Sequence, residues 1–293
     1  MEFFQLEAFL AVARLKSFAQ AAVELAHTQP AISISIKKLE QEIGSPLFDR
    51  YRREVKLTDA GSALMEYARQ ILNLRQEAFS AMEELQQLHE GKVRIGANES
   101  TNLYLLPKMI LIYREHFPRI KVEVFRSSSI QLPREIKERN LDFGIIAFDP
   151  ADRELDSFPI LEDELVLIVR PDHVLAKKRK VTIETLGTET FVAHNVKSPS
   201  RYHVIAAFRD AGVPLNIGIE LSSIETIKQF VEMNLGIAFV PRLAVANELR
   251  ERKFVAVPLR DFQHKRILRV IFLRDKVQSH AAAKFLDVLR KLS

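Results

Sequence analysis

Apolar residues at helical spacing mark two short segments near the start of the chain. The first follows Ser17, which forms a capping box with Gln20, and its apolar positions are Phe18, Ala21, Ala22 and Leu25. The second follows Thr28, with Pro30 in its first turn and an apolar stripe of Ile32, Ile36, Leu39 and Ile43. The pattern predicts two helices joined by a tight turn, with an outer face on the second that carries Gln29, Ser33 and Lys37.

Two helices in this arrangement are typical of a helix-turn-helix. Alanines in the first helix allow a close crossing, and the second helix offers short polar side chains to base edges in the major groove of DNA. A glutamine such as Gln29 can read adenine, whereas Ser33 would accept several bases. From this pattern alone, two helices of an ordinary protein core are the alternative.

A short hairpin with a basic turn is predicted after these helices. Its strand-like apolar residues are Leu47, Phe48, Val55 and Leu57, and the basic residues clustered between them are Arg50, Arg52, Arg53 and Lys56. Lys and Arg side chains gathered in a hairpin turn are suited to contacts with DNA phosphates. The hairpin therefore favours DNA binding over the ordinary core.

The next apolar pattern is a heptad seam that runs for about four heptads. Steps of three and four residues connect Leu57, Ala60, Leu64, Tyr67, Ile71, Leu74, Ala78, Ala81, Leu85 and Leu88. The seam predicts a helix of about 30 residues, roughly 45 Å long, that ends at Gly91 after His89 and Glu90. We expect it to pair with a second copy of itself; the alternative is a helix that lies on the core of its own chain.

Beyond Gly91 strands and helices alternate, which predicts an α/β fold with a parallel sheet covered by helices. The first set comprises strands 92–97, 121–125 and 142–147 and helices 103–117 and 132–140. The second set comprises strands 164–170, 190–193, 216–220 and 237–240 and helices 200–211 and 224–234. A strand at 266–274 and a helix at 279–292 then return, so the pattern describes two lobes joined by two crossovers.

Composition narrows the function further. With 293 residues, of which 47% are hydrophobic, the chain can form two or three domains. It has no cysteine, which excludes disulfides, thiolate metal sites and a thiol redox switch. Since neither a leader nor an apolar run of about 18 residues is present, we expect a cytoplasmic protein that enters no membrane. The net charge of +5 does not itself indicate DNA binding, because residues 1–60 carry eight basic and eight acidic side chains.

The chain lacks the motifs of the common enzyme classes. Dinucleotide-binding, P-loop, nucleophile-elbow and zincin motifs are absent, and the eight histidines are scattered without metal-ligand spacing. His194 and His203 flank a predicted loop and are interpreted as surface residues rather than ligands. We therefore predict a binding protein without a cofactor or metal. A solute-binding protein for transport is the alternative to a DNA-binding regulator, and the missing leader and the N-terminal helix pair argue against it.

Ordered motifs along the whole chain resemble the LysR-type transcriptional regulators. In the N-terminal part they are SFxxAAxxL at 17–25, TQPAIS at 28–33, LE at 39–40, GxPLFxR at 44–50 and LTxAG at 57–61. In the C-terminal part they are RIGA at 94–97, YLLPKMI at 104–110, FP at 117–118, LDFGI at 141–145 and LGIAFVP at 235–241. Motifs this long and in this order are far more specific than an isolated three-residue match.

The resemblance implies a winged helix-turn-helix at 1–58, a linker helix at 59–90 that pairs in antiparallel fashion, and an effector domain at 91–293 similar to periplasmic binding proteins. The first lobe of that domain would comprise 91–161 and 267–293, and the second would comprise 162–266. The implied partners are double-stranded DNA at AT-rich, dyad-symmetric promoter sites, a small-molecule effector, RNA polymerase, and further copies of the chain in a dimer of dimers.

The predicted DNA-binding residues combine the outer face of the second helix with the basic turn. They are Thr28, Gln29, Pro30, Ser33, Ile34, Lys37, Arg50, Arg52 and Arg53. Ile34 departs from the family, in which a polar or basic residue is usual at this position. It either touches a thymine methyl group, or packs against the hairpin or the neighbouring helix and reads nothing.

Effector-binding residues are predicted at the carboxyl ends of strands, where helix N-termini offer free N–H groups to anions. These residues are Asn98, Glu99, Ser100, Thr101, Ser128, Ser129, Ser200 and Arg201. By position, Ser100 and Ser129 match residues that hydrogen-bond inducers in similar proteins; the alternative is that each hydroxyl only caps its own helix. Glu99 would repel a carboxylate ligand, select a cationic or neutral one, or point away.

Two local features belong to the same part of the chain. Ser222 and Glu225 have the spacing of a further capping box. Asn234 stands where the family usually has glycine. Because asparagine tolerates the left-handed backbone conformation, we expect the turn at Asn234 to be kept.

Overall fold

The computed structural model describes residues 1–49, 54–86, 91–179 and 181–292. The chain divides into two compact units, Met1–Gln86 with Lys137–Asn140, and Gln87–Ile136 with Leu141–Ser293. The predicted phosphate contacts Arg50, Arg52 and Arg53 lie outside the described residues, as does the predicted helix end at 89–90.

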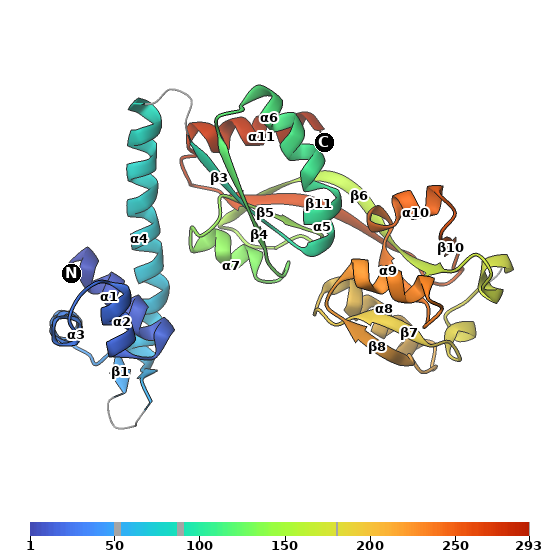
Figure 1. Cartoon of the computed structure of the whole chain (residues 1–293), viewed down its shortest axis with the longest axis horizontal. Helices are drawn as coiled ribbons and strands as arrows, with labels where there is room; N and C mark the ends of the chain where they lie inside the picture. Colours follow the sequence, from blue (N-terminus) through green and yellow to red (C-terminus); the bar gives the residue numbers. More distant parts are fainter. Residues whose placement is uncertain (50–53, 87–90, 180, 293) are drawn as a thin grey trace. The chain divides into compact units, whose positions relative to one another are not determined.

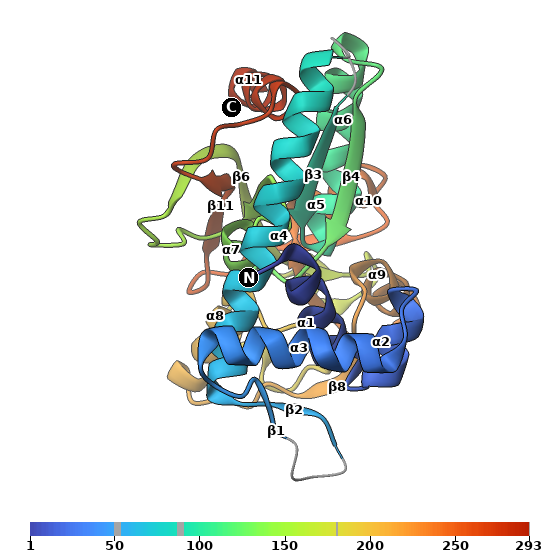
Figure 2. The ribbon, with the colours of Figure 1, turned by 90° about the vertical axis from the view of Figure 1, so that its left-hand side faces the viewer.

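The first unit begins with three helices, α1 (Phe3–Leu15), α2 (Phe18–Glu24) and α3 (Gln29–Ile43) (Figure 2). The Ser17 hydroxyl caps α2 by accepting a hydrogen bond from the backbone N–H of Gln20 at 3.2 Å. The Thr28 hydroxyl caps α3 in the same way, at 3.4 Å from the N–H of Ala31. The two predicted helices and their caps are confirmed, whereas α1 was not predicted.

These helices share one hydrophobic core, which includes the fully buried residues Phe9, Ile32, Ile36 and Leu39. Ile43 was predicted to belong to the same stripe but is 38% exposed, because it is the last residue of α3 and projects past the core. α3 stops at Gly44, whose φ of 78° suits a residue without a side chain. A short antiparallel hairpin follows, β1 (Phe48–Asp49) and β2 (Lys56–Leu57).

The linker helix α4 (Asp59–Gln86) is a single helix of 28 residues, about 42 Å long at 1.5 Å per residue. Its first half packs against the core of α1 to α3 through residues that include Leu64 and Ile71. The alternative of a helix on its own core therefore holds for that half. Other apolar side chains of α4 are 51–65% exposed within one chain, namely Tyr67, Leu74, Phe79 and Met82.

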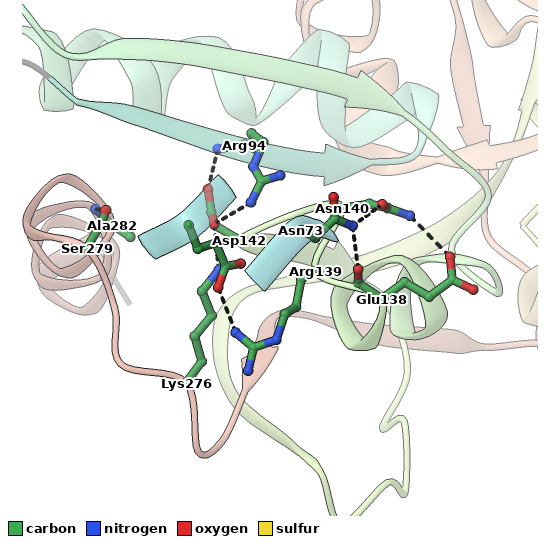
Figure 3. Close-up of polar contacts among 10 residues, drawn as sticks. Asn73, Arg94, Glu138, Arg139, Asn140, Asp142, Lys276, Ser279 and Ala282 are labelled. Carbon is green, nitrogen blue, oxygen red and sulfur yellow. Dashed lines mark hydrogen bonds and ion pairs between the residues drawn. The ribbon is translucent and has the colours of Figure 1, made fainter. Parts of the chain in front are cut away.

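The polar side of α4 contacts the short segment Lys137–Asn140, which clusters with the first unit. The Asn73 amide donates to the Glu138 carbonyl at 2.7 Å and to the Asn140 side chain at 2.8 Å (Figure 3). Arg139 pairs with Glu77 at 2.6 Å. These polar residues of α4 are thus engaged, in contrast to its exposed apolar residues.

One mixed sheet runs through the second unit in the order β10-β6-β11-β5-β3-β4, with β9 paired to β6. Its strands are β3 (Lys92–Ala97), β4 (Lys121–Arg126), β5 (Phe143–Ile146), β6 (Leu155–Val169), β9 (Ala238–Pro241), β10 (Val255–Val257) and β11 (His264–Leu273). Among these strands β3 pairs in parallel with β4 and β5, and the other pairs are antiparallel. A purely parallel sheet was therefore a wrong prediction, because the chain passes between the lobes along two neighbouring strands, β6 and β11, that run in opposite directions.

The first lobe is a three-layer structure in which helices cover both faces of the sheet. Its helices are α5 (Glu99–Tyr104), α6 (Leu106–His116), α7 (Leu132–Lys137) and α11 (His280–Leu292), with α6 and α11 on one face and α7 on the other (Figure 1). Neighbouring strand residues alternate between the two cores: Ile145 packs in the core under α6 and α11, and Ile146 packs in the core under α7.

A buried ion cluster fixes the start of β5 in this lobe. Asp142 accepts hydrogen bonds from the Arg94 backbone N–H at 2.8 Å and from Lys276 Nζ at 2.8 Å (Figure 3). Burial alone would raise the pKa of Asp142, but Lys276 and Arg94 outweigh it and hold that pKa below its usual range. The carboxylate is therefore charged and compensated in the folded protein.

The second lobe contains a small parallel sheet, β7 (Phe191–His194) and β8 (Ile217–Leu221), and the helices α8 (Pro199–Asp210), α9 (Ile224–Glu232) and α10 (Ala246–Arg250). Short 3-10 turns lie at Val174–Lys177, Glu184–Leu186 and Arg242–Ala244. Asn234 has a φ of 63°, which confirms the expected left-handed turn. α10, β10 and the first half of β6 were not predicted.

Within the part of the chain that the structure describes, none of the helices combines the length and apolar character needed to span a membrane.

Candidate DNA-binding surface and effector cavity

The outer face of α3 is available to a partner. Gln29, Pro30 and Lys37 are exposed, Ser33 is half-buried, and the opposite face is buried in the core. Ile34 is 56% exposed, so more than half of its surface is open to a partner. An uncovered apolar side chain beside polar ones can contact a thymine methyl group.

The described part of the hairpin is held against the start of α4. Phe48 pairs with Leu57 and Asp49 with Lys56 in the β1–β2 ladder. A Cβ atom at Gly61 would lie 2.2 Å from the Leu47 carbonyl oxygen, so only glycine permits this close approach. The glycine of the LTxAG motif therefore positions the hairpin relative to α4.

A cavity of about 440 Å³ lies between the two lobes of the second unit, within the size range of small-molecule sites. Its lining comes from the carboxyl ends of β3, β4 and β7 and from the starts of α8 and α9. Seven of the eight predicted effector residues line it, the exception being Thr101. Thr101 is fully buried and faces the protein interior, so it offers no surface to a ligand.

Asn98 organises one wall of the cavity. Its side-chain oxygen accepts hydrogen bonds from the Thr101 N–H and the Ser100 hydroxyl, both at 3.0 Å, and thereby caps α5. Its amide group donates to the Ser129 hydroxyl at 3.0 Å. The turns after β3 and β4 are thus joined, and Ser100 and Ser129 lie on the same hydrogen-bond network.

Glu99 is buried, with 7% of its surface exposed, and contacts the opposite lobe. Its Oε2 atom accepts a hydrogen bond from the Ile224 N–H at 3.2 Å and lies 3.4 Å from both Arg126 Nη2 and His194 Nε2. The expected capping box of Ser222 and Glu225 does not form, because Ser223 is the N-cap residue of α9 and its side chain makes no cap bond. The Glu99 carboxylate takes that role from the other lobe.

The second lobe supplies Ser200 and Arg201 from the first turn of α8. The Ser200 hydroxyl lies 3.1 Å from His264 Nε2, and Arg201 contacts the Glu220 carboxylate and the His194 carbonyl. Burial lowers the pKa of His264, and neighbouring positive groups lower it further. A neutral His264 that carries its proton on Nδ1 can accept a hydrogen bond from the Ser200 hydroxyl at Nε2.

The cavity wall also includes Arg266, a nearly buried residue of β11. Its Nε and Nη2 atoms donate to Asp163 Oδ2 at 2.9 and 2.7 Å, and Asp163 Oδ1 accepts from the Leu243 N–H at 3.0 Å. This ion pair joins β6 and β11, the two strands that pass between the lobes.

Arg126 and Arg266 were not among the residues predicted from the sequence, and His194, which was interpreted as a surface residue, is half-buried and lines the cavity. Arg126 directly precedes the serines at the end of β4, so extending the strand-end rule by one residue would have found it. His194 and Arg266 face their partners only after distant parts of the chain fold together. Among the described residues, no three or more His, Cys, Asp or Glu side chains form a metal-binding group.

An exposed recognition-type helix followed by a two-lobed domain with a cavity defines a ligand-responsive DNA-binding protein. The models of two domain families match the chain: "Bacterial regulatory helix-turn-helix protein, lysR family" over residues 3–62, and "LysR substrate binding domain" over residues 86–293. The chain belongs to the LysR family of transcriptional regulators. It is thus a regulator with a DNA-binding and an effector-binding domain, and not an enzyme.

Relatives agree with this assignment, and solved structures share the fold. A probable RuBisCO transcriptional regulator of Synechocystis sp. is 34% identical and covers 99% of this chain and 86% of its own length. The protein of that description from Cyanidioschyzon merolae is 36% identical over 96% of this chain and 95% of its own length. The crystal structure of CbnR, a LysR family regulator, superposes with a TM-score of 0.74 at 22% identity, covering 100% of this chain and 99% of that one. The Synechocystis CcmR regulatory domain in complex with 2-PG gives a TM-score of 0.63 at 26% identity, covering 69% of this chain and 96% of that one.

Proposed function

We propose that this regulator binds AT-rich, dyad-symmetric DNA sites as a dimer of dimers and responds to a small acidic metabolite held between its two lobes. The observation that carries the proposal is that one chain has both an exposed polar face on α3 and a cavity between two lobes that is lined by seven of the predicted effector residues. RNA polymerase would be the further partner through which a bound dimer changes transcription. Such a protein acts where the DNA is, in the cytoplasm.

For DNA, we assign the base contacts to Gln29, Ser33 and Ile34 and the phosphate contacts to Lys37 and the basic residues at 50–53. Glutamine can bond adenine bidentately and isoleucine can contact the thymine methyl, so both side chains suit A·T pairs. Thr28 and Pro30 fix the helix N-terminus at the groove. Each half-site alone would bind weakly, which is why a dimer is needed.

For assembly, we assign one interface to the exposed apolar side of α4, formed by Tyr67, Leu74, Phe79 and Met82. The first lobe carries further exposed apolar side chains, Leu103, Leu111, Val124 and Phe125, which suit a second interface. Covering these side chains with a second copy is favourable, because it removes apolar surface from water. Two different interfaces per chain give a dimer of dimers.

For the effector, we propose a small carboxylic acid or phosphate ester. Four cationic side chains line the cavity, against one lining carboxylate, Glu99. Arg126, Arg201 and Arg266 already contact the carboxylates of Glu99, Glu220 and Asp163. Among the described residues Lys197 is the lining cation that has no such contact, so it is the one to which an acidic ligand would add a counter-charge. The hydroxyl and amide donors around Asn98 add polar contacts. The similar CcmR domain binds 2-PG according to the description of its structure, which makes 2-PG the first compound to test.

A thermal-unfolding series of the full chain tests the effector proposal. We expect 2-PG or inorganic phosphate to raise Tm, by the equivalent of about 2.7 kcal/mol at a hundredfold excess over Kd, and glycerol at equal concentration to leave it unchanged. Equal shifts with acids and with glycerol, or none with any acid, would contradict an acidic effector. DNA binding measured on the same samples tests the DNA-binding part of the proposal separately from the effector.

A further inference from the structure

The surroundings of Glu99 have the composition of an anion-binding site. Three groups from separate elements lie against its Oε2 atom: the Ile224 N–H at the start of α9 and Arg126 at the end of β4 donate to it, and His194 Nε2 at the end of β7 lies 3.4 Å away. His194 Nε2 faces two acceptors, Glu99 and the Ser222 carbonyl at 3.2 Å, so this nitrogen carries a hydrogen. A backbone N–H at a helix start, a guanidinium and an imidazole N–H are the groups that bind carboxylates and phosphates.

Glu99 also connects the lobes. It lies on α5 in the first lobe, whereas His194 and Ile224 belong to the second. Arg126 of the first lobe donates to the Ser222 carbonyl of the second at 3.0 Å. At the other end of α5, Tyr104 accepts a hydrogen bond from Lys228 of α9 at 3.1 Å. Both ends of α5 are therefore hydrogen-bonded to α9 in this structure, in which the cavity is present.

We propose that Glu99 is an internal stand-in for an acidic ligand. Its carboxylate holds the position between Arg126, His194 and the start of α9 that an effector's acidic group would otherwise take, and it ties the two lobes together. The inference rests on the proposed effector cavity and names the residue that decides which ligand charge this end of the cavity accepts.

Two consequences follow from this arrangement. In the wild-type chain an anion gains little at this end of the cavity, because the donors are already used and Glu99 repels it. When the charge of Glu99 is removed, the donors become available to a free anion, and the tie between the lobes depends on that anion. Glu99→Gln is nearly isosteric and keeps one hydrogen-bond acceptor, so it isolates the charge.

The first test is calorimetric titration of the full chain with inorganic phosphate and with 2-PG. We expect Glu99→Gln to bind phosphate roughly tenfold more tightly than wild type, with the gain shrinking at high salt. The matched control is Glu123→Gln, which removes a carboxylate of the same lobe that pairs with Lys121, a neighbour on its own strand, at 2.6 Å. Equal phosphate affinity in wild type and Glu99→Gln would overturn the proposal.

The second test measures the distance between the lobes and needs no ligand. Because the chain has no cysteine, Arg119→Cys in the first lobe and Arg209→Cys in the second accept spin labels without other changes. Diluting labelled with unlabelled chain removes distances between copies, and double electron–electron resonance then reports the lobe separation.

We expect one narrow distance in wild type and in Glu123→Gln, and a broader distribution in Glu99→Gln that narrows again with phosphate. Glu99→Gln weakens the hydrogen bonds of the charged carboxylate to the other lobe, which should shift the ratio of closed to open lobes roughly tenfold or more toward the open form. An unchanged distribution in Glu99→Gln would overturn the tie. Failure of the titration or of the distance measurement would leave the proposed DNA-binding function standing, because specific DNA binding by wild type tests that function without reference to Glu99.

Discussion

Leu74 and Leu64 lie on the same heptad seam of α4, and the structure gives them different neighbours. Leu64 packs against the core of α1 to α3 in its own chain, whereas Leu74 is 51% exposed. We predict that Leu74→Ala weakens the dimer without changing the stability of the fold, and that Leu64→Ala does the reverse. Comparing the two variants separates the contribution of a second copy from that of the chain's own core.

The size of the effect follows from the exposed surface. Complete burial of a leucine side chain contributes about 1.5–3 kcal/mol, so covering the exposed half of Leu74 contributes about 0.8–1.5 kcal/mol per chain. A symmetric dimer contains the residue twice, which gives about 1.5–3 kcal/mol, or roughly a 10- to 100-fold larger dimer Kd. Leu74→Asp would add the burial of a charge on each chain and should separate the dimer almost completely.

Sedimentation velocity over a concentration series measures the dimer Kd, and thermal unfolding of the same samples measures stability. Leu74→Ala should move the monomer–dimer transition to higher concentration, and Leu64→Ala should lower Tm while leaving that transition close to its wild-type position. If Leu74→Ala and Leu74→Asp both sedimented as wild type, the exposed side of α4 would not be an interface. If Leu64→Ala weakened the dimer more than Leu74→Ala, the assignment of Leu64 to the chain's own core and of Leu74 to the dimer interface would be wrong.

The remaining predictions concern the effector domain. Asn98→Ala removes the cap of α5 and the bonds to Ser100 and Ser129, so thermal unfolding should show a loss of about 2–3 kcal/mol, whereas Asn98→Asp, which keeps the acceptor, should lose less. Asp142→Asn removes the charge that faces the buried Lys276 and should cost about 2–4 kcal/mol at pH 7. Because the folded pKa of Asp142 lies below its unfolded value of about 4, this contribution is present above that pH and is lost as the pH falls through the folded pKa. Urea unfolding from pH 7 to pH 3 should therefore show the difference between wild type and Asp142→Asn narrowing; a constant difference would contradict the charged state of Asp142.

Local signals were enough to predict much of this fold. Ser17 and Thr28 cap their helices because a side-chain oxygen reaches an N–H three residues on, an interaction that needs no tertiary structure. The strand at 92–97 has the predicted bounds because its apolar run stops at a turn of polar residues. Short elements such as α10 contain too few residues to show a period, so they were missed.

Tertiary neighbours could not be predicted in the same way. Periodicity identifies the apolar side of α4, but it does not say whether the protein's own core or a second copy covers Leu64 or Leu74. Glu99 meets the N–H of Ile224 across 125 positions of sequence, and the spacing of residues around either of them carries no trace of the other. The strand-end rule still brought Asn98, Ser100 and Ser129 to one cavity, because the carboxyl ends of parallel neighbours lie at one edge of a sheet.

Selection of bound duplexes from a random DNA pool by the full chain shows directly whether the outer face of α3 recognises DNA. Wild type should enrich an interrupted, AT-rich dyad. Gln29→Ala should keep non-specific affinity but lose preference at one base position per half-site, by about 1–3 kcal/mol. Gln76→Ala, a matched change on exposed α4, should enrich the same sites as wild type. Failure of wild type to enrich any dyad, or identical enrichment by wild type and Gln29→Ala, would contradict recognition of DNA by the outer face of α3.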